Sequence, residues 1–185
     1  MDMEENEVQW MKESGTQMVA KLGVQPGQTV VDFGCGVGCY SIPLAKAVGE
    51  KGTVYAIERS NECLAELQKR ALRFNAPDSL MVIQSNDMQL ESIPSGSADF
   101  LFAFDVLQHI DDWPLFFATV DRVLKPSGIL HLYPAEIPHP GEVDMVKLVD
   151  VLKTLGFEQV ESKEYEMMHN KFHLKDRIYT FRRVE

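Results

Sequence analysis

The sequence lacks the features of a secreted or membrane-spanning protein. It contains only three cysteines, Cys35, Cys39 and Cys63, which form neither an even-numbered disulfide framework nor a Cys-x-x-Cys pair. Its longest strongly apolar runs, such as residues 100–104, are far shorter than the roughly 20 residues that cross a bilayer. Residues 1–9 are acidic and have no apolar core of a secretion signal. We therefore expect a cytoplasmic protein with no membrane partner.

Basic residues are also scarce. Lys and Arg number 18 against 28 Asp and Glu, which gives a formal net charge of −10 and a pI near 5.0. Because attraction to phosphates dominates nucleic-acid binding, we expect no nucleic-acid partner and predict a small-molecule ligand. The chain of 185 residues is 45% hydrophobic, which is typical of one globular domain. We expect a monomer or a homodimer.

What the chain does contain is an alternation of short apolar strands with amphipathic helices. A first amphipathic helix is predicted over residues 4–22, and a last pair of strands, near 157–161 and 177–184, is predicted to form an antiparallel hairpin with a loop between them. Between these ends we expect strands at 29–33, 53–57, 80–83, 99–104 and 129–133, and helices at 40–48, after Ser60, at 112–124 and at 142–155. This order predicts an α/β fold, a doubly wound seven-stranded sheet that is mostly parallel with an antiparallel C-terminal strand and helices on both faces.

The most informative segment follows the first predicted strand, where Asp32 precedes glycines at alternate positions, Gly34, Gly36 and Gly38. Ligands of such sheets bind beyond the carboxyl ends of the strands, and glycines let the backbone approach them closely. A dinucleotide site has the pattern Gly-x-Gly-x-x-Gly, but here the third glycine comes one residue early, and Asp32 would repel a pyrophosphate. No Gly-Lys-Ser/Thr of a nucleotide-triphosphate loop follows. The loop suits a cationic ligand without phosphate, such as S-adenosylmethionine.

Residues 30–38 resemble the first motif of class I S-adenosylmethionine-dependent methyltransferases of the small-molecule branch. Four later segments resemble further motifs of that family in the same order, and the resemblance covers most of the chain from about residue 24. These segments are residues 54–58, 84–88, 104–110 and 124–130. The resemblance implies a Rossmann-like methyltransferase fold, S-adenosylmethionine as the methyl donor, S-adenosylhomocysteine as the product, and a small-molecule acceptor.

The resemblance also implies roles for individual residues. Glu58 would bind the ribose hydroxyls, Asp87 would accept a hydrogen bond from the adenine amino group with the Met88 amide near the ring, and Asp32 would lie near the methionine ammonium. Arg59 departs from the family pattern, which has an apolar residue there, so its guanidinium either stacks on the adenine or points to solvent. The full expected set of cofactor-binding residues is Asp32, Gly34, Cys35, Gly36, Gly38, Glu58, Arg59, Asp87, Met88 and Phe104.

A catalytic base cannot be assigned from the sequence. His109, Glu136 and His139 follow the fourth and fifth predicted strands, where the acceptor pocket is expected, and His109 fits a structural hydrogen bond equally well. The cysteines are interpreted as small buried residues, because arsenite methylation would require further thiols and none follows Cys63. His169 and His173 have helical metal-ligand spacing, but their segment is interpreted as a hairpin loop, and no metal is expected.

We expect residues 1–23 to form a helical lid, with Trp10, Met11 and Met18 lining or covering the acceptor site, and residues 24–185 to form the single S-adenosylmethionine-binding domain. Two alternatives to a methyltransferase stay open. The first is a partner subunit that binds S-adenosylmethionine without catalysis. The second is an NAD(P)-dependent oxidoreductase, which the early third glycine and Asp32 disfavour.

Overall fold

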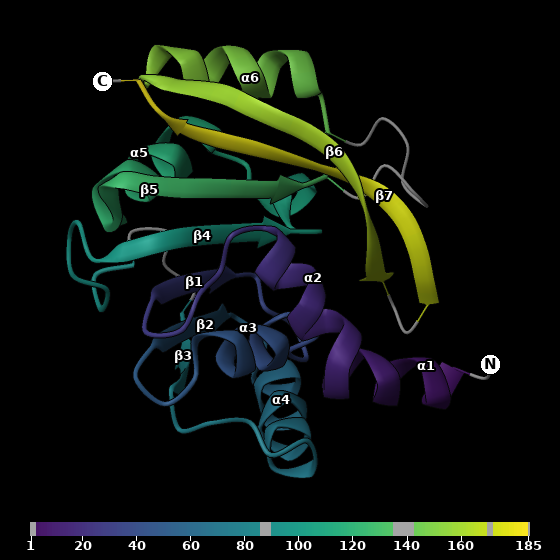
Figure 1. Ribbon diagram of the computed structural model, residues 1–185. Coiled ribbons are helices and arrows are strands. Elements are labelled where there is room, and N and C mark those ends of the chain that lie inside the picture. Colours follow the sequence, from purple (N-terminus) through teal and green to yellow (C-terminus); the bar gives the residue numbers. More distant parts are fainter. Residues whose placement is uncertain (1–2, 86–89, 135–142, 170–171, 185) are drawn as a thin grey trace.

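The computed structural model describes residues 3–85, 90–134, 143–169 and 172–184. Its centre is a seven-stranded sheet with the order β3-β2-β1-β4-β5-β7-β6 (Figure 1). Neighbouring strands from β3 to β5 pair in parallel, and β7 pairs antiparallel with both β5 and β6, so the predicted fold class is confirmed. The strands are β1 (Thr29–Phe33), β2 (Thr53–Glu58), β3 (Leu80–Gln84), β4 (Ala98–Phe104), β5 (Leu124–Tyr133), β6 (Phe157–His169) and β7 (Phe172–Arg183).

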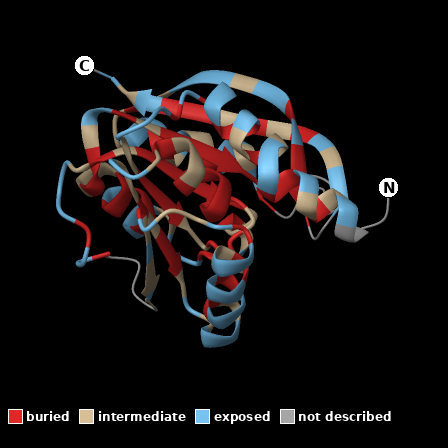
Figure 2. Cartoon of the chain, turned by 60° about the horizontal axis from the view of Figure 1, so that its bottom comes forward, coloured by how far each residue is buried: buried red, intermediate tan, exposed pale blue. Residues whose placement is uncertain are grey.

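Apolar helices cover both faces of this sheet, which explains why its central strands are nearly continuous apolar runs. Along β4, Phe100, Phe102 and Phe104 pack into one core cluster with α3, whereas Leu101 and Ala103 pack into a second cluster with α5 and α6. In Figure 2 the buried residues accordingly fill the central sheet, while the outer face of α4 is exposed. The helices are α3 (Ser41–Val48), α4 (Asn61–Arg73), α5 (Trp113–Val123) and α6 (Met145–Thr154). None of the helices in the described ranges has the length and apolarity needed to span a membrane.

The first predicted helix consists of three segments, α1 (Met3–Gln9), a π-helical turn η1 (Trp10–Ser14) and α2 (Gly15–Lys21). Trp10 and Met11 are 1% and 0% exposed, and together with Met18 they belong to the core cluster formed with α3. Gly15 permits this close packing, since a Cβ atom there would lie 2.7 Å from Pro43 Cγ. None of these three side chains lines the cavity at the carboxyl ends of the strands, because they pack into the core that covers the sheet. The prediction that they line the acceptor site is therefore wrong, and the role of residues 1–23 as a lid over that site stays a prediction.

The C-terminal hairpin is much longer than the sequence-based prediction. Its register continues without a loop as far as the pair His169 and Phe172. The extension alternates exposed charged residues with buried ones, and Tyr165 and Met167 are 7% and 0% exposed. This part of the hairpin curves toward α1, where the His173 ring lies 3.3 Å from the Asn6 carbonyl oxygen (Figure 1). The prediction of a loop around His169 and His173 is wrong, since both lie on strands.

Two other boundaries differ by a few residues. β5 begins at Leu124 rather than at 129, because Leu124 already pairs with Ala98; residues 125–128 then form an irregularity before Ile129 pairs with Phe100. α6 begins after Asp144, whose carboxylate accepts a hydrogen bond from the Lys147 amide. The Ser60 cap of α4 is confirmed, because its hydroxyl accepts from the Cys63 amide at 3.2 Å.

Candidate active site

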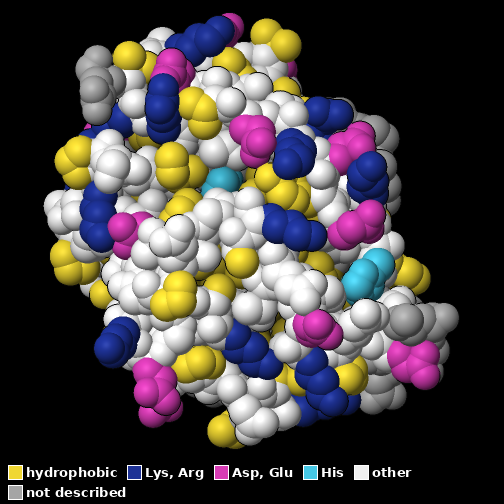
Figure 3. All heavy atoms as spheres, in the orientation of Figure 1, with side chains coloured by type: hydrophobic (Ala, Val, Ile, Leu, Met, Phe, Trp, Pro, Cys, Tyr) yellow, Lys and Arg dark blue, Asp and Glu magenta, His cyan; other side chains and the backbone are white. Residues whose placement is uncertain are grey.

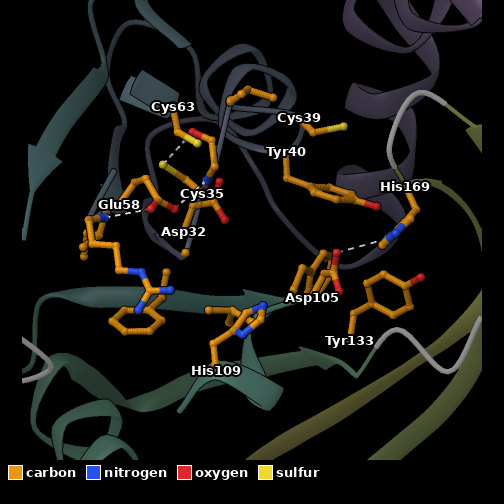
Figure 4. Close-up of a pocket in the computed structure, with 18 of the residues that line it drawn as sticks. Asp32, Cys35, Cys39, Tyr40, Glu58, Cys63, Asp105, His109, Tyr133 and His169 are labelled. Atoms are coloured by element: carbon orange, nitrogen blue, oxygen red, sulfur yellow. Dashed lines mark hydrogen bonds and ion pairs between the residues drawn. The ribbon is translucent and has the colours of Figure 1, made fainter. Parts of the chain in front are cut away.

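A cavity of about 700 Å³ lies at the carboxyl ends of β1, β2, β4 and β5 and extends to the end of β6 (Figure 4). Most of the predicted cofactor residues line it, namely Asp32, Gly34, Cys35, Gly36, Glu58, Arg59 and Phe104, and so does His109. Gly38 is outside the lining. Asp87, Met88, Glu136 and His139 lie outside the described residues. The volume is typical of a small-molecule site.

The glycine loop folds back onto β2, because the amides of Gly34 and Cys35 both donate to the Ile57 carbonyl. All three loop glycines have positive φ, at 74°, 52° and 81°. A Cβ atom on Gly34 would lie 2.5 Å from Val106 Cγ2, and one on Gly38 would lie 2.8 Å from Leu67 Cγ. A Cβ atom on Gly36 would meet nothing within 4 Å. Gly34 and Gly38 are thus required by packing, whereas Gly36 leaves its backbone open to a ligand.

Glu58 ends β2 and holds the loop in place. Its Oε1 accepts from the amides of Arg59 and Ser60, each at 2.9 Å, and its Oε2 accepts from the Gly36 amide at 3.1 Å. A carboxylate oxygen has two lone pairs, so Oε2 keeps an acceptor position. The carboxylate can therefore bind a hydroxyl group of a ligand while it fixes the loop.

Asp32 is the most buried acid of the cavity, at 2% exposure. Its pKa is raised to about 6, chiefly by burial and to a smaller extent by the nearby Glu58 carboxylate, while the hydrogen bond from the Ser41 hydroxyl lowers it. In the described ranges no Lys or Arg side chain lies within ion-pair distance of Asp32. A cationic ligand would therefore stabilise the ionised form of this buried carboxylate strongly.

Asp105 follows β4 at the other end of the cavity. It adopts a φ of 54°, which is uncommon for a residue other than glycine and is a form of backbone strain found often at functional sites. Its amide donates to the Tyr133 carbonyl at 2.8 Å, and its carboxylate accepts from the Gln108 amide group at 3.0 Å. Its Oδ2 lies 3.2 Å from Nδ1 of His169, a side chain that is 6% exposed. Asp105 thus orients the imidazole into the lining of the cavity.

Aromatic rings surround this pair. Phe104 contacts Tyr40 and Tyr133 edge to face, with centroids 4.9 and 5.8 Å apart, and Tyr133 packs against His169 at 6.5 Å. The Tyr40 hydroxyl donates to the Met168 carbonyl at 2.8 Å. Burial, and then the nearby Asp176 carboxylate, raise the pKa of Tyr133 far above its usual value. The end of the cavity beside Asp105 is therefore apolar and aromatic with neutral tyrosines.

A buried ion pair closes the edge of the cavity toward α1. Glu7 and Arg70 are 6% and 7% exposed, and their side chains form a salt bridge. Arg70 also donates to the carbonyl of Val37 in the glycine loop at 3.0 Å. One guanidinium therefore links α1, α4 and the loop.

All three cysteines line the cavity as free thiols. Burial raises the pKa of Cys39 to about 12 and raises that of Cys35 even more, so both stay protonated and unreactive.

Sequence reasoning missed several lining residues, namely Glu7, Tyr40, Arg70, Asp105, Tyr133 and His169. Asp105 could have been found, since it is the first residue after a predicted strand of the sheet. The burial of His169 could have been predicted from the period-two pattern that it continues after Tyr165 and Met167, but its place beside Asp105 could not. Glu7 and Arg70 give no such signal, because their helices read as amphipathic surface helices.

Comparison with known proteins gives one match to a sequence family. The model of a family described as a methyltransferase domain matches residues 31–132. Similar curated proteins include a demethylmenaquinone methyltransferase of Geobacillus stearothermophilus, 29% identical over 66% of this chain and 50% of that protein. Another is the 2-methyl-6-phytyl-1,4-hydroquinone methyltransferase of Synechocystis, 35% identical over 57% of this chain and 31% of that protein. The chain thus spans half or less of the length of these relatives.

Solved structures show the same fold. A SAM-dependent methyltransferase from Aquifex aeolicus matches with a TM-score of 0.73 and 22% identity over 98% of this chain and 97% of that one. The magnesium protoporphyrin IX methyltransferase of Synechocystis with bound SAH matches with a TM-score of 0.69 and 22% identity, covering 96% of this chain and 84% of that one.

Proposed function

Because this chain belongs to the methyltransferase domain family, whose model matches more than half of it, we propose that it transfers a methyl group from S-adenosylmethionine to a small-molecule acceptor. The observation that carries the proposal is the series of carboxylates along one cavity. Glu58 ends β2, Asp32 lies near the end of β1 and Asp105 follows β4, and these three strands are neighbours in the sheet (Figure 4). A cationic, phosphate-free nucleoside fits this lining, and a pyrophosphate does not.

The described residues fit the donor in three places. Glu58 has an acceptor position for a ribose hydroxyl, Gly36 leaves its backbone open, and Asp32 offers a buried carboxylate to the methionine ammonium. Arg59 is exposed at the rim, where its guanidinium can stack on the adenine. The roles of Asp87 and Met88 at the adenine stay predictions.

When bound, S-adenosylmethionine supplies a methyl group that its sulfonium already activates. The chain's own task is to hold the acceptor in line with that methyl group and to exclude water. Alignment of this kind can contribute about 7–11 kcal/mol to the reaction. The packed loop glycines and the hydrogen bonds of Glu58 provide a rigid frame for it.

Calorimetry with S-adenosylmethionine, S-adenosylhomocysteine and NAD tests the proposal. We expect binding of the first two, no binding of NAD, and at least tenfold weaker binding in Glu58→Gln, because a charge-assisted hydrogen bond to the ribose is lost. Glu62→Gln, in the exposed first turn of α4, is the matched control and should bind normally. Absence of heat from both donors would overturn the proposal. Binding without methyl transfer to any acceptor in a panel assayed with labelled donor would favour the non-catalytic partner subunit.

The predicted partner, cellular location and oligomeric state are properties of the whole protein. On the face drawn in Figure 3, Lys and Arg side chains lie beside Asp and Glu side chains, which supports a small molecule rather than a nucleic acid as the partner. The free thiols agree with a reducing compartment. A cytoplasmic location and a monomeric or homodimeric state stay predictions, which cell fractionation and analytical ultracentrifugation test.

A further inference from the structure

We propose that His169, oriented by Asp105, is the general base of the reaction, and that the acceptor is an aromatic compound whose ionisable hydroxyl gives its proton to this imidazole. The inference rests on the proposed function and deepens it, because it names the residue that receives the proton and the class of acceptor that the cavity selects.

The position of the pair along the cavity is the first argument. Glu58 lies at one end of the view in Figure 4, Asp32 lies in the middle, and Asp105 with His169 lies at the other end. If Glu58 holds the ribose and Asp32 the ammonium, the donor occupies the part of the cavity beside β2 and β1. The part beside β4, β5 and the end of β6 is then left for the acceptor. Phe104, Tyr133 and His169 line this part.

The ion-pair contact between the two side chains is the second argument. Asp105 Oδ2 faces Nδ1 of His169 at 3.2 Å, which favours the tautomer with its proton on Nδ1. Nε2 then carries the lone pair that can take a proton, and the Asp105 carboxylate stabilises the imidazolium that results. Asp105 is itself held by Gln108 and by its bond to the Tyr133 carbonyl. Asp105 is thus a positioning residue for His169.

His109, the candidate from the sequence, lacks this support. It also lines the cavity, but it is exposed, and its described hydrogen bond is made by its backbone amide to the Val106 carbonyl. An unsupported imidazole at the surface can sample many orientations, whereas a base must hold one.

The lining of the acceptor end is the third argument, and it defines the acceptor. The rings of Tyr40, Phe104 and Tyr133 present edges and faces to a flat aromatic molecule. The carboxylates of the cavity disfavour an acceptor that carries a fixed negative charge, whereas a phenol enters neutral and becomes an anion only beside the imidazolium. An imidazole can deprotonate a phenol, whose ordinary pKa is about 10, but not an aliphatic alcohol, which is a far weaker acid.

The transfer step balances with these groups alone. The acceptor oxygen attacks the methyl carbon, a carbon–oxygen bond forms, and the carbon–sulfur bond breaks with its electron pair going to sulfur. The hydroxyl proton passes to Nε2 of His169 and later leaves to water. The products are the methyl ether and S-adenosylhomocysteine.

The described contacts around His169 agree with this role. They include Asp105 after β4, Tyr133 on β5 with Asp176 of β7 behind it, and Tyr40, whose hydroxyl contacts the Met168 backbone. Burial raises the pKa of both tyrosines, so they stay neutral through the working range. Neither tyrosine therefore competes with the imidazole for the proton of the acceptor.

The test uses the full chain, saturating S-adenosylhomocysteine and 4-nitrophenol, whose ionisation changes its visible absorption. Below the ordinary pKa of 4-nitrophenol, we expect wild-type protein to bind it as the phenolate and His169→Gln to bind it as the neutral phenol. Turnover of phenols should fall roughly 100- to 10,000-fold in His169→Gln. Affinity for S-adenosylhomocysteine should stay within about twofold of wild type, since the donor binds elsewhere.

Asp105→Asn should lower the turnover of phenols and the share of 4-nitrophenol that is bound as the phenolate, because it removes the anion beside the imidazole. Asn tolerates the positive φ at this position, so this variant should fold. His173→Gln is the matched control, since His173 is an exposed histidine of the same hairpin outside the cavity, and its turnover and phenolate binding should equal those of wild type.

Each result decides between the two proposals. If S-adenosylhomocysteine does not bind to the wild type, the proposed function and this inference both fail. If it binds but His169→Gln still binds 4-nitrophenol as the phenolate and methylates phenols at the wild-type rate, only the inference fails. If 4-nitrophenol does not bind, or if amines and not phenols are methylated, the acceptor class is wrong. Loss of turnover in His109→Gln rather than in His169→Gln would move the base to η2 (Leu107–His109).

Discussion

Asp32 is a single residue whose charge serves ligand binding and destabilises the unliganded fold. Its pKa is raised from 3.8 to about 6, chiefly by burial, so the folded state holds a proton that the unfolded chain releases more readily. Stability from this group is fully present below pH 3.8 and is lost as the pH rises through 6. The ionised carboxylate at neutral pH therefore costs about 3 kcal/mol.

The first prediction is that Asp32→Asn stabilises the unliganded protein at pH 7.5 and weakens the binding of S-adenosylmethionine by roughly 10- to 100-fold, since a charge-assisted contact is lost. Urea unfolding and calorimetry measure the two effects. Asp150→Asn, in an exposed pair with Lys153, is the control for the change in net charge. A variant that is less stable and binds normally would show that Asp32 is a structural residue only.

The loop glycines give a second prediction with an internal control. Gly38→Ala should destabilise the fold by about 1–3 kcal/mol beyond the backbone strain, because its Cβ would lie 2.8 Å from Leu67 Cγ. Gly36→Ala has open space, so it should cost only the strain of positive φ, about 1–2 kcal/mol, while it obstructs the donor. Thermal unfolding with and without S-adenosylhomocysteine separates the loss of stability from the loss of ligand binding. If both variants lost stability and ligand binding equally, the packing role of Gly38 would not differ from the ligand-contact role of Gly36.

For single residues, the sequence was informative where a side chain lies at the carboxyl end of a strand. Asp32, Glu58 and Phe104 were predicted for the cavity and line it. His169 was missed because it comes from a distant hairpin, and its place beside Asp105 depends on how far that hairpin curves over the sheet. Such a contact is set by tertiary packing, which a local pattern does not encode.

At the scale of elements, the N-terminal helix is joined to the cavity by the pair of Glu7 and Arg70 rather than by the apolar side chains that the sequence suggested. Both partners are more than nine-tenths buried, and Arg70 continues to the Val37 carbonyl. Removing one partner of a buried pair leaves an uncompensated charge.

We therefore expect Glu7→Gln to lower the free energy of unfolding by about 3–5 kcal/mol and to weaken donor binding through the glycine loop. Chemical unfolding and calorimetry provide the measurements. Glu66→Gln removes one partner of an exposed pair with Lys69 on α4 and should change stability by less than about 1 kcal/mol. If the two variants behave alike, α1 is not coupled to the site through this ion pair.

Element boundaries show where prediction from sequence stops. The alternation of strands and helices along the chain and the cap of α4 depend on local signals, the apolar runs and the Ser60 side chain, and they were predicted. The start of α6 was placed at residue 142 although the Asp144 side chain caps it. The outer half of the hairpin carries Lys163, Glu164 and Glu166 on its exposed side, so its composition resembles a loop. Tyr165 and Met167 are buried because the N-terminal helical segments cover the other side of the hairpin, with α2 packed against β6 and α1 against β7.

At the scale of the whole molecule, two buried groups far apart in the sequence give opposite responses to acid. His131 on β5 binds the Leu22 carbonyl through Nε2 at 3.1 Å and the Thr180 hydroxyl through Nδ1 at 3.0 Å, so it ties the end of α2 to β7 as a neutral imidazole. Burial lowers its pKa from 6.5 to about 4, against the smaller effect of the Leu22 carbonyl. Its stabilisation is complete above pH 6.5 and is lost as the pH falls through 4, a change of about 3 kcal/mol.

As the pH falls over nearly the same range, protonation of Asp32 adds nearly the same free energy of unfolding that protonation of His131 removes. In the wild type the two contributions therefore cancel. We expect the unfolding free energy of Asp32→Asn to fall by about 3 kcal/mol more than that of wild type between pH 6.5 and pH 4, because only His131 then responds. His131→Gln should show the reverse slope, and the double variant should return to the wild-type slope whatever its absolute stability. Urea unfolding of the unliganded protein across this range measures all four slopes. If Asp32→Asn and wild type lose stability in parallel, the buried carboxylate does not hold its proton to pH 6, and the electrostatic account of the donor site is wrong as well.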